Sequence, residues 1–276
     1  MKVRTITSAI LLAITIPILL LSEYLVYPIA LALVSLAAIF ELFRVIGVHK
    51  YWVISVPAYV LSMALPLSSY FVGSEGRIEY LLFVAIAIFA YLLYVMSVAV
   101  FSKGEIKSSK SAEVFMSFTY VVASFTSLCT IRYINHGMLC FLLVFLTAWG
   151  SDAMAYIVGS LIGKHKLIPD VSPKKTVEGS IGGVLCSMLL CMAYGLVIEL
   201  ITEYTANYLT LAITGLILAV VSQIGDLIAS LIKREYGVKD YGNLLPGHGG
   251  IMDRFDSILA VSTPLMVICI IFPPFI

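Results

Sequence analysis

The amino-acid sequence predicts an all-α polytopic integral membrane protein with about nine transmembrane helices. Of the 276 residues, 61% are hydrophobic and 12% are charged, whereas soluble domains usually carry about 25% charged residues. The mean hydropathy is +1.05. The apolar residues form runs of about 17–25 residues, which cross a bilayer as helices, and not the alternating stretches of about ten residues typical of β-barrels. This composition excludes a soluble enzyme and a disordered protein, and the net charge of +1 excludes a nucleic-acid binder.

Each apolar run is expected to be helical, because backbone groups in lipid must form hydrogen bonds within their own segment. The first run follows Lys2 and Arg4, as in a signal peptide. No small-residue cleavage pattern follows it, so we expect an uncleaved first span. The expected spans cover residues 5–22, 24–43, 51–72, 80–101, 113–131, 138–162, 180–199, 207–232 and 256–273.

Basic residues alternate between the loops of this arrangement. If the N-terminus is cytoplasmic, every Lys and Arg except Arg77 and Arg132 falls in a cytoplasmic segment, as the positive-inside rule requires. The sequence therefore predicts a cytoplasmic N-terminus and an outside C-terminus. We further expect two parts, an N-terminal part of about five spans and a C-terminal catalytic region with two long cytoplasmic loops rich in Gly, Pro, Lys and Asp. These parts are residues 1–135 and 136–276, and the loops are 163–179 and 233–255.

Two acidic residues interrupt the C-terminal spans, Asp152 in the sixth and Asp226 in the eighth. Ionisable groups inside a membrane are costly and usually functional. Asp226, Ser230 and Lys233 are spaced four and three apart, so they share a helical face that runs towards the cytoplasm. A helix-packing hydrogen bond, or a pairing of Asp226 with Lys233, would also explain this pattern.

The loop segment 172–179 places Ser172, Lys174 and Lys175 beside a threonine and a glycine. Adjacent lysines and hydroxyl groups can bind phosphate oxygens. The same lysines would also serve as ordinary positive-inside anchors. From the residues alone, both interpretations stay open.

The segment 239–256 is denser in chemistry-bearing residues than any other loop. Glycines flank His248 and allow the backbone to approach a ligand closely. Asp253 and Asp256 are three apart, so they face the same side if a helix begins here. Carboxylates near phosphate oxygens form the oxygen environment that Mg²⁺ prefers, although acidic residues also favour the first turn of any helix. Transfer of a nucleotidyl or phosphoryl group to a lipid would suit such a site, since it needs positioning and charge neutralisation more than a protein nucleophile.

These residues resemble the signature of phosphatidate cytidylyltransferases, also called CDP-diacylglycerol synthases. The resemblance rests on Ser230-Leu231-Ile232-Lys233-Arg234, Lys239-Asp240 and the run from Leu245 to Asp256. It extends to the run from Ser172 to Gly183 and to Gly163-Lys164-His165-Lys166-Leu167. The N-terminal half is similar to the family only as a set of apolar spans.

The resemblance implies an enzyme of phospholipid biosynthesis that converts CTP and phosphatidic acid to CDP-diacylglycerol and pyrophosphate. It implies a bacterial inner-membrane protein with a cytoplasmic active site, Mg²⁺ dependence with room for a second cation, and a homodimer. Asp226 and Asp253 would hold the metal, with Asp256 as a further partner, and Lys174 and Lys175 would face the phosphates of CTP. The remaining expected catalytic or substrate-binding residues are Ser172, Ser230, Lys233, Arg234, Lys239, Asp240, His248 and Arg254.

The chain departs from the family pattern at three positions outside these expected metal ligands. Met154 stands where Gly is common, Ser160 where Arg is common, and Val177 where Trp is usual. The role of Asp152 therefore stays open. Two alternatives remain: a CTP-dependent polyprenol or phytol kinase, and a secondary transporter that uses Asp152 and Asp226 as coupling-ion sites.

Overall fold

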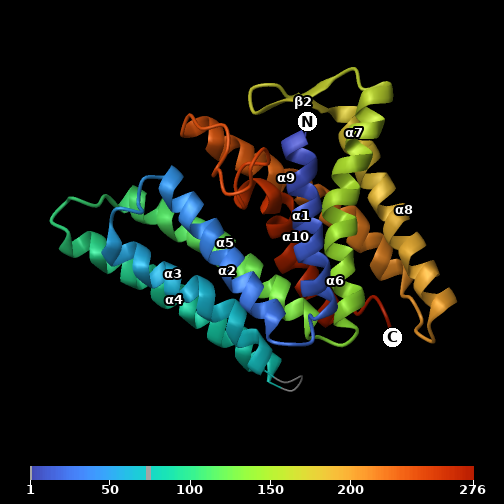
Figure 1. Ribbon diagram of the computed structural model, residues 1–276, viewed down its shortest axis with the longest axis horizontal. Helices are drawn as coiled ribbons and strands as arrows, with labels where there is room; N and C mark the ends of the chain where they lie inside the picture. The colour runs from blue at the N-terminus through green and yellow to red at the C-terminus, as the bar shows by residue number, and fades with distance from the viewer. Residues whose placement is uncertain (1, 73–75) are drawn as a thin grey trace. The chain divides into compact units, whose positions relative to one another are not determined.

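The computed structural model describes residues 2–72 and 76–276 and consists mainly of long helices (Figure 1). The first five helices are α1 (Lys2–Leu20), α2 (Val26–Val45), α3 (Trp52–Ser68), α4 (Arg77–Phe101) and α5 (Ser108–Arg132), with the short 3₁₀ turn η1 (Ser69–Phe71) after α3. The elements that follow are α6 (Gly137–Phe145), η2 (Leu146–Gly150), α7 (Ser151–Ile162), β1 (Lys166–Ile168), β2 (Ser172–Thr176), α8 (Val177–Ile201), α9 (Tyr208–Glu235) and α10 (Met252–Ile271).

Among the described residues, eight helical segments are long and apolar enough to cross a membrane. A shorter apolar helix, Thr5–Leu20, precedes them, and α6, η2 and α7 together form one segment, Gly137–Ile162. The all-α polytopic class is therefore confirmed, and the chain is an integral membrane protein. The sidedness of the termini stays a prediction.

Helices α9 and α10 extend further into the predicted loop 233–255 than expected, because α9 ends at Glu235 and α10 begins at Met252. Most of the extra residues are charged, so hydropathy did not mark them as part of a span. Lys233 and Arg234 occupy the last turn of α9, and Asp253 lies in the first turn of α10. Charges of these signs stabilise those helix ends through the helix dipole.

The chain divides into two compact units. The first unit comprises the described part of residues 1–133 together with Val238–Arg254, and the second comprises Ile134–Gly237 and Phe255–Ile276. The segment Val238–Arg254 thus belongs with the N-terminal helices. The division predicted at residue 135 separates the chain by catalytic role. The two compact units are defined by packing, so they do not test this division, and it stays a prediction.

In the first unit, α2 packs against α3 and α5, and α4 packs against α3 and α5 (Figure 1). Phe43, Phe118 and Phe125 are fully buried between these helices. Two buried tyrosines have their hydroxyl groups satisfied by helix carbonyls: Tyr27 donates to the Leu128 oxygen at 3.1 Å, and Tyr91 to the Ile54 oxygen at 3.1 Å. Such pairing is needed because an unsatisfied polar group in a lipid environment is costly.

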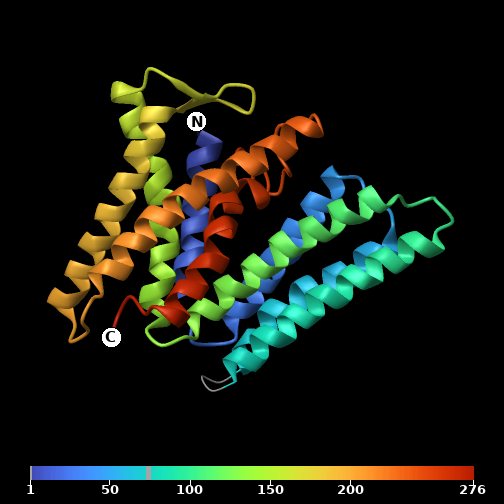
Figure 2. The same cartoon turned by 180° about the vertical axis from the view of Figure 1, so that it is seen from behind.

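In the second unit, α8 packs against both α7 and α9, and Figure 2 shows α8 and α9 crossing. Glycines lie where these helices touch. A Cβ atom at Gly183 would collide with Ala155 of α7, and one at Gly215 would collide with the backbone of Met188 in α8. Small residues at these points let helix backbones approach closely, which is how helices associate in membranes.

The predicted loop 163–179 contains a β-hairpin that the sequence did not indicate. Strands β1 and β2 pair antiparallel, with Lys166 opposite Thr176 and Ile168 opposite Ser172. The strands are short and largely polar, so they lack the apolar alternation that predicts a strand. Thr176 ends the hairpin and caps α8, since its hydroxyl oxygen accepts a hydrogen bond from the Gly179 nitrogen at 3.2 Å.

Candidate functional site

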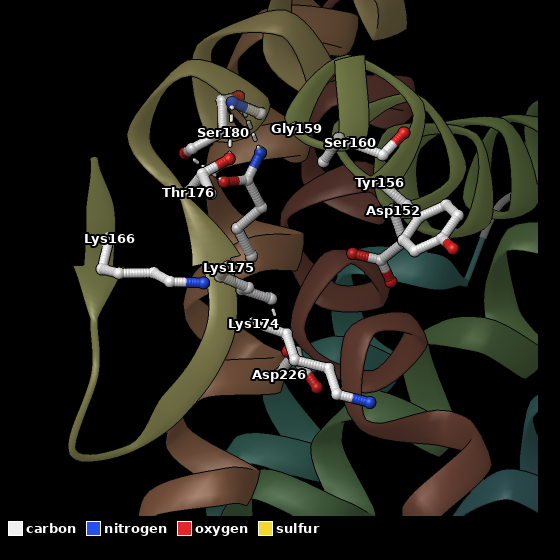
Figure 3. A pocket seen from close by; sticks show the side chains of 13 residues that line it. Asp152, Tyr156, Gly159, Ser160, Lys166, Lys174, Lys175, Thr176, Ser180 and Asp226 are labelled. Atoms are coloured by element: carbon white, nitrogen blue, oxygen red, sulfur yellow. Dashed lines mark hydrogen bonds and ion pairs between the residues drawn. The ribbon is translucent and has the colours of Figure 1, made fainter. Parts of the chain in front are cut away.

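A cavity of about 550 Å³ lies in the second unit and is lined by α7, the hairpin, α8 and α9. Figure 3 shows Asp152 and Lys166 extending towards this space from opposite sides. Its lining combines carboxylates, ammonium groups and hydroxyl groups. The polar side chains are those of Asp152, Tyr156, Ser160, Lys166, Lys174, Lys175, Thr176, Ser180, Gln223 and Asp226.

An ion pair in the cavity joins the hairpin to α9. The Lys175 Nζ and Asp226 Oδ2 atoms are 2.5 Å apart, and the two side chains are 25% and 26% exposed. Because both groups are mostly removed from water, this attraction is screened less than that of a surface ion pair. The sequence placed both residues in the site, but it indicated Lys233, and not Lys175, as the partner of Asp226.

Two more carboxylates lie near Asp226, one on the cavity wall and one on α10. The carboxylates of Asp152 and Asp256 both repel that of Asp226, while Lys175 attracts Asp152 and Lys233 attracts Asp256. Such a group of acidic side chains is held apart by mutual repulsion and offers oxygen atoms to a cation.

Ser257 of α10 fixes the orientation of two of these carboxylates. Its hydroxyl group donates to Asp152 Oδ2 at 3.1 Å, and its backbone nitrogen donates to Asp256 Oδ1 at 2.8 Å. The short π-helical segment η2 lies directly before Ser151 and Asp152. Such segments locally widen the helix and recur at functional sites.

Within the described residues, no three His, Cys, Asp or Glu side chains form a ready-made metal centre. This does not exclude Mg²⁺, which commonly binds one or two carboxylates and completes its coordination with water and substrate phosphates. Asp226 and Asp256 offer donors of the right chemistry. In the structure the Lys175 ammonium group is paired with the Asp226 carboxylate. A metal cation can bind this carboxylate only if the ammonium group moves away.

A pair of polar side chains holds α8 to α9 beside the cavity. The Ser180 hydroxyl group donates a hydrogen bond to Gln223 Oε1, and Gln223 Nε2 donates to the Ser180 carbonyl oxygen at 3.2 Å. Gln223 precedes Asp226 by three residues on α9, so the two side chains share a face. The two hydrogen bonds therefore fix the position of Asp226 along α9 relative to the start of α8.

Glu178 secures the base of the hairpin that carries the lysines. Its Oε2 accepts from the backbone nitrogens of Lys164 at 3.1 Å and His165 at 3.2 Å. Its Oε1 lies 2.6 Å from His165 Nδ1. These contacts hold the base of the hairpin, and they thereby restrict the positions of Lys174 and Lys175 on β2.

The loop 238–254 of the first unit is shaped by one of the predicted metal ligands. Asp253 Oδ2 accepts hydrogen bonds from the backbone nitrogens of Tyr241 at 2.8 Å and Gly250 at 3.0 Å. Arg254 Nε donates to the His248 carbonyl oxygen at 2.9 Å, and the Ser8 hydroxyl group lies 3.1 Å from His248 Nε2. One oxygen of Asp253 therefore organises its own loop, and its role as a metal ligand stays a prediction.

The sequence-derived candidates thus divide between the two units. Three of them, Lys174, Lys175 and Asp226, line the cavity. Asp256 neighbours Asp226 electrostatically. Ser172 lies on β2, and the last two turns of α9 carry Ser230, Lys233 and Arg234. Those in the first unit are Lys239, Asp240, His248, Asp253 and Arg254, and their predicted roles stay predictions.

Sequence reasoning did not single out several residues that line the cavity. Gln223 carried a usable signal, because it is a polar residue in an apolar span and lies one turn before Asp226. Lys166 and Ser180 lie in the two runs that carry the family resemblance, but neither was given a role of its own, because a loop lysine and a helix-start serine are common. Ser160 lines the cavity at the position where the family pattern has Arg, so this cavity carries one fewer cation than that pattern implies.

Comparisons with known proteins add an independent finding. The chain matches the model of the cytidylyltransferase family over residues 2–272. A phosphatidate cytidylyltransferase of Staphylococcus haemolyticus is 36% identical over 273 residues, covering 98% of this chain and 99% of the relative. Proteins of the same name from Staphylococcus epidermidis and Staphylococcus aureus are also 36% identical, each over 98% of this chain and 99% of the relative.

Proposed function

The chain belongs to the cytidylyltransferase family, and from this premise we propose that it transfers the cytidylyl group of CTP to phosphatidic acid. The products are CDP-diacylglycerol and pyrophosphate. The observation that carries the proposal is the paired Lys175 and Asp226 in a cavity that Lys166 and Lys174 also line. Ammonium groups beside carboxylates suit a triphosphate, which brings several negative charges of its own.

In the proposed reaction, a phosphate oxygen of phosphatidic acid attacks the α-phosphorus of CTP in line. A new P–O bond forms, the bond between the α-phosphorus and its bridging oxygen breaks, and the electron pair leaves with pyrophosphate. The attacking oxygen is already ionised near neutral pH, so no general base is required. Lys166, Lys174 and Lys175 stabilise the charge that develops on the leaving group.

Asp226 and Asp256 would hold a Mg²⁺ ion, which would supply positive charge to neutralise the reacting phosphates. Lys175 exchanges Asp226 for a phosphate oxygen when CTP enters, which leaves this carboxylate available. Asp256 is attracted by Lys233, so a basic side chain on α9 balances the second carboxylate.

The expected surroundings follow from the same proposal. The bilayer supplies phosphatidic acid and the cytoplasm supplies CTP. The protein therefore lies in a bacterial inner membrane, with the cavity open to the cytoplasm. This sidedness agrees with the distribution of Lys and Arg along the chain. The homodimer expected from the family resemblance stays a prediction.

A double-label assay tests the proposal. Purified protein in mixed micelles receives Mg²⁺, phosphatidic acid and CTP labelled at either the α- or the γ-phosphate. We expect the α-label to enter the lipid fraction, the γ-label to appear in pyrophosphate, and EDTA to stop both.

The other outcomes of this assay identify the alternatives. Entry of the γ-label into lipid, with release of CDP, would show a lipid kinase. Absence of both labels from lipid and pyrophosphate, with uptake of solute by proteoliposomes, would show a transporter.

A further inference from the structure

Helix α2 of the first unit carries a buried carboxylate that the reaction described above does not use. Glu41 lies within an apolar span and is only 5% exposed. An ionisable side chain at such a position is costly and needs compensating contacts. Its hydrogen-bond partner Met252 and its close neighbours Gly242 and Gly250 lie in the segment 238–254, about two hundred residues away along the chain.

Glu41 caps the start of α10. Its Oε2 atom accepts a hydrogen bond from the backbone nitrogen of Met252 at 3.0 Å, and Met252 is the first residue of that helix. The first N–H groups of a helix have no partner within the helix, and a negative group at this end is favoured by the helix dipole.

A second residue of α2 holds the other end of the same segment. Arg44, three residues after Glu41, donates from Nη2 to the Tyr241 carbonyl oxygen at 2.9 Å. The nitrogen of Tyr241 donates in turn to Asp253 Oδ2. The segment 241–252 is therefore fixed at both ends by adjacent positions on one helix face.

Two glycines of the segment lie so close to this carboxylate that a larger residue would not fit. A Cβ atom at either Gly242 or Gly250 would collide with the carboxylate of Glu41. Neither glycine has the positive φ that disfavours other residues, whereas Gly249 has a φ of +82°. Close approach to Glu41 therefore explains the glycines at 242 and 250, and backbone conformation explains Gly249.

From this geometry we propose that Glu41 is a positioning residue for cytidylyl transfer, an inference that rests on the proposed function. It holds the segment 241–252 and the first turn of α10 in one arrangement. The side chains that follow directly, Asp253 and Arg254, to which the family resemblance assigns metal-binding and substrate-binding roles, thereby keep fixed directions. Glu41 acts through the backbone and touches no substrate.

The first test compares two substitutions of Glu41. Glu41→Ala removes the acceptor, and we expect kcat to fall about 10²-fold, because small misplacements of reacting groups have effects of this size. Glu41→Gln retains one acceptor oxygen and the side-chain volume, so we expect kcat within about threefold of wild type. KM for CTP should change less than kcat in both variants, since no substrate contact is removed.

A double-mutant cycle separates this role from general packing. Gly250→Ala should lower kcat strongly in the wild-type background, because the new methyl group displaces Glu41. In the Glu41→Ala background the same substitution should have little further effect, since the collision is gone. Gly249→Ala is the matched control: its penalty arises from its positive φ and from a Cβ atom 2.8 Å from Asp253 Oδ2, and neither involves Glu41, so it should be harmful in both backgrounds.

A protease assay provides a readout that does not depend on activity. Lys239 and Arg254 are exposed and flank the segment, so trypsin reports its opening. We expect faster cleavage at these sites in Glu41→Ala than in wild type, and wild-type cleavage in Glu41→Gln.

Several results would overturn the inference. These are independent, multiplicative effects of Glu41→Ala and Gly250→Ala, a Glu41→Gln variant as impaired as Glu41→Ala, or unchanged cleavage in Glu41→Ala. If wild-type protein made no CDP-diacylglycerol, the proposed function would fail, while the protease result would still report on how Glu41 holds the loop.

Discussion

Replacing Asp226 with Asn lowers the rate of CDP-diacylglycerol formation about 10³-fold, which corresponds to about 4 kcal/mol of transition-state stabilisation. The substitution preserves the size of the side chain and removes its negative charge. The asparagine at this position can no longer form an ion pair with the Lys175 ammonium group, and it contributes no charge to a bound Mg²⁺ ion. Because an amide group fits the same space, the protein should still insert and fold.

The measurement is the initial rate of incorporation of the α-label of CTP into lipid, with size-exclusion behaviour and thermal unfolding as checks on folding. Asp170→Asn is the matched control, because Asp170 lies exposed in the turn of the hairpin and does not line the cavity. This variant should retain wild-type activity. Normal turnover in Asp226→Asn would remove the carboxylate from the mechanism.

Replacing Lys175 with Met is expected to have the second-largest effect, a fall in kcat of about 10²–10³-fold. Methionine keeps much of the length and the apolar stem of lysine but carries no charge. Its introduction leaves Asp226 without its counter-ion, next to the mutually repelling carboxylates of Asp152 and Asp256. It also removes one of the ammonium groups available to the leaving pyrophosphate.

Steady-state kinetics over a range of CTP concentrations measure this effect. Lys107→Met is the control, because Lys107 is an exposed residue before α5 in the other unit. In the double variant of Asp226→Asn and Lys175→Met, the losses should be far from additive, since each residue acts through the other. Fully multiplicative losses would show that the ion pair has no part in the reaction.

The helical architecture could be predicted from the sequence because a membrane span is a local property. About twenty apolar residues in a row have essentially one stable conformation in lipid. The same locality explains the errors at helix ends. Polar residues such as Lys233 and Asp253 belong to helices by backbone geometry, yet they resemble loop residues in any measure of hydropathy.

The candidate site could be predicted only in part, because its central contacts join distant segments. The expected face of Asp226, Ser230 and Lys233 follows from helical periodicity, but the ion pair with Lys175 crosses from α9 to a hairpin that has no apolar alternation. Glu41 was indistinguishable from an incidental polar residue in the second span. Its partners, Gly250 and Met252, become evident only once the chain is folded.

The central claim is that the triphosphate of CTP binds among the lysines of the cavity, and amine-reactive labelling measured by mass spectrometry tests it most directly. The account predicts that CTP with Mg²⁺ protects Lys166, Lys174 and Lys175, which line the cavity. It predicts unchanged labelling of Lys103 and Lys107, which are exposed in the other unit. Equal labelling of the three cavity lysines with and without CTP would contradict the account.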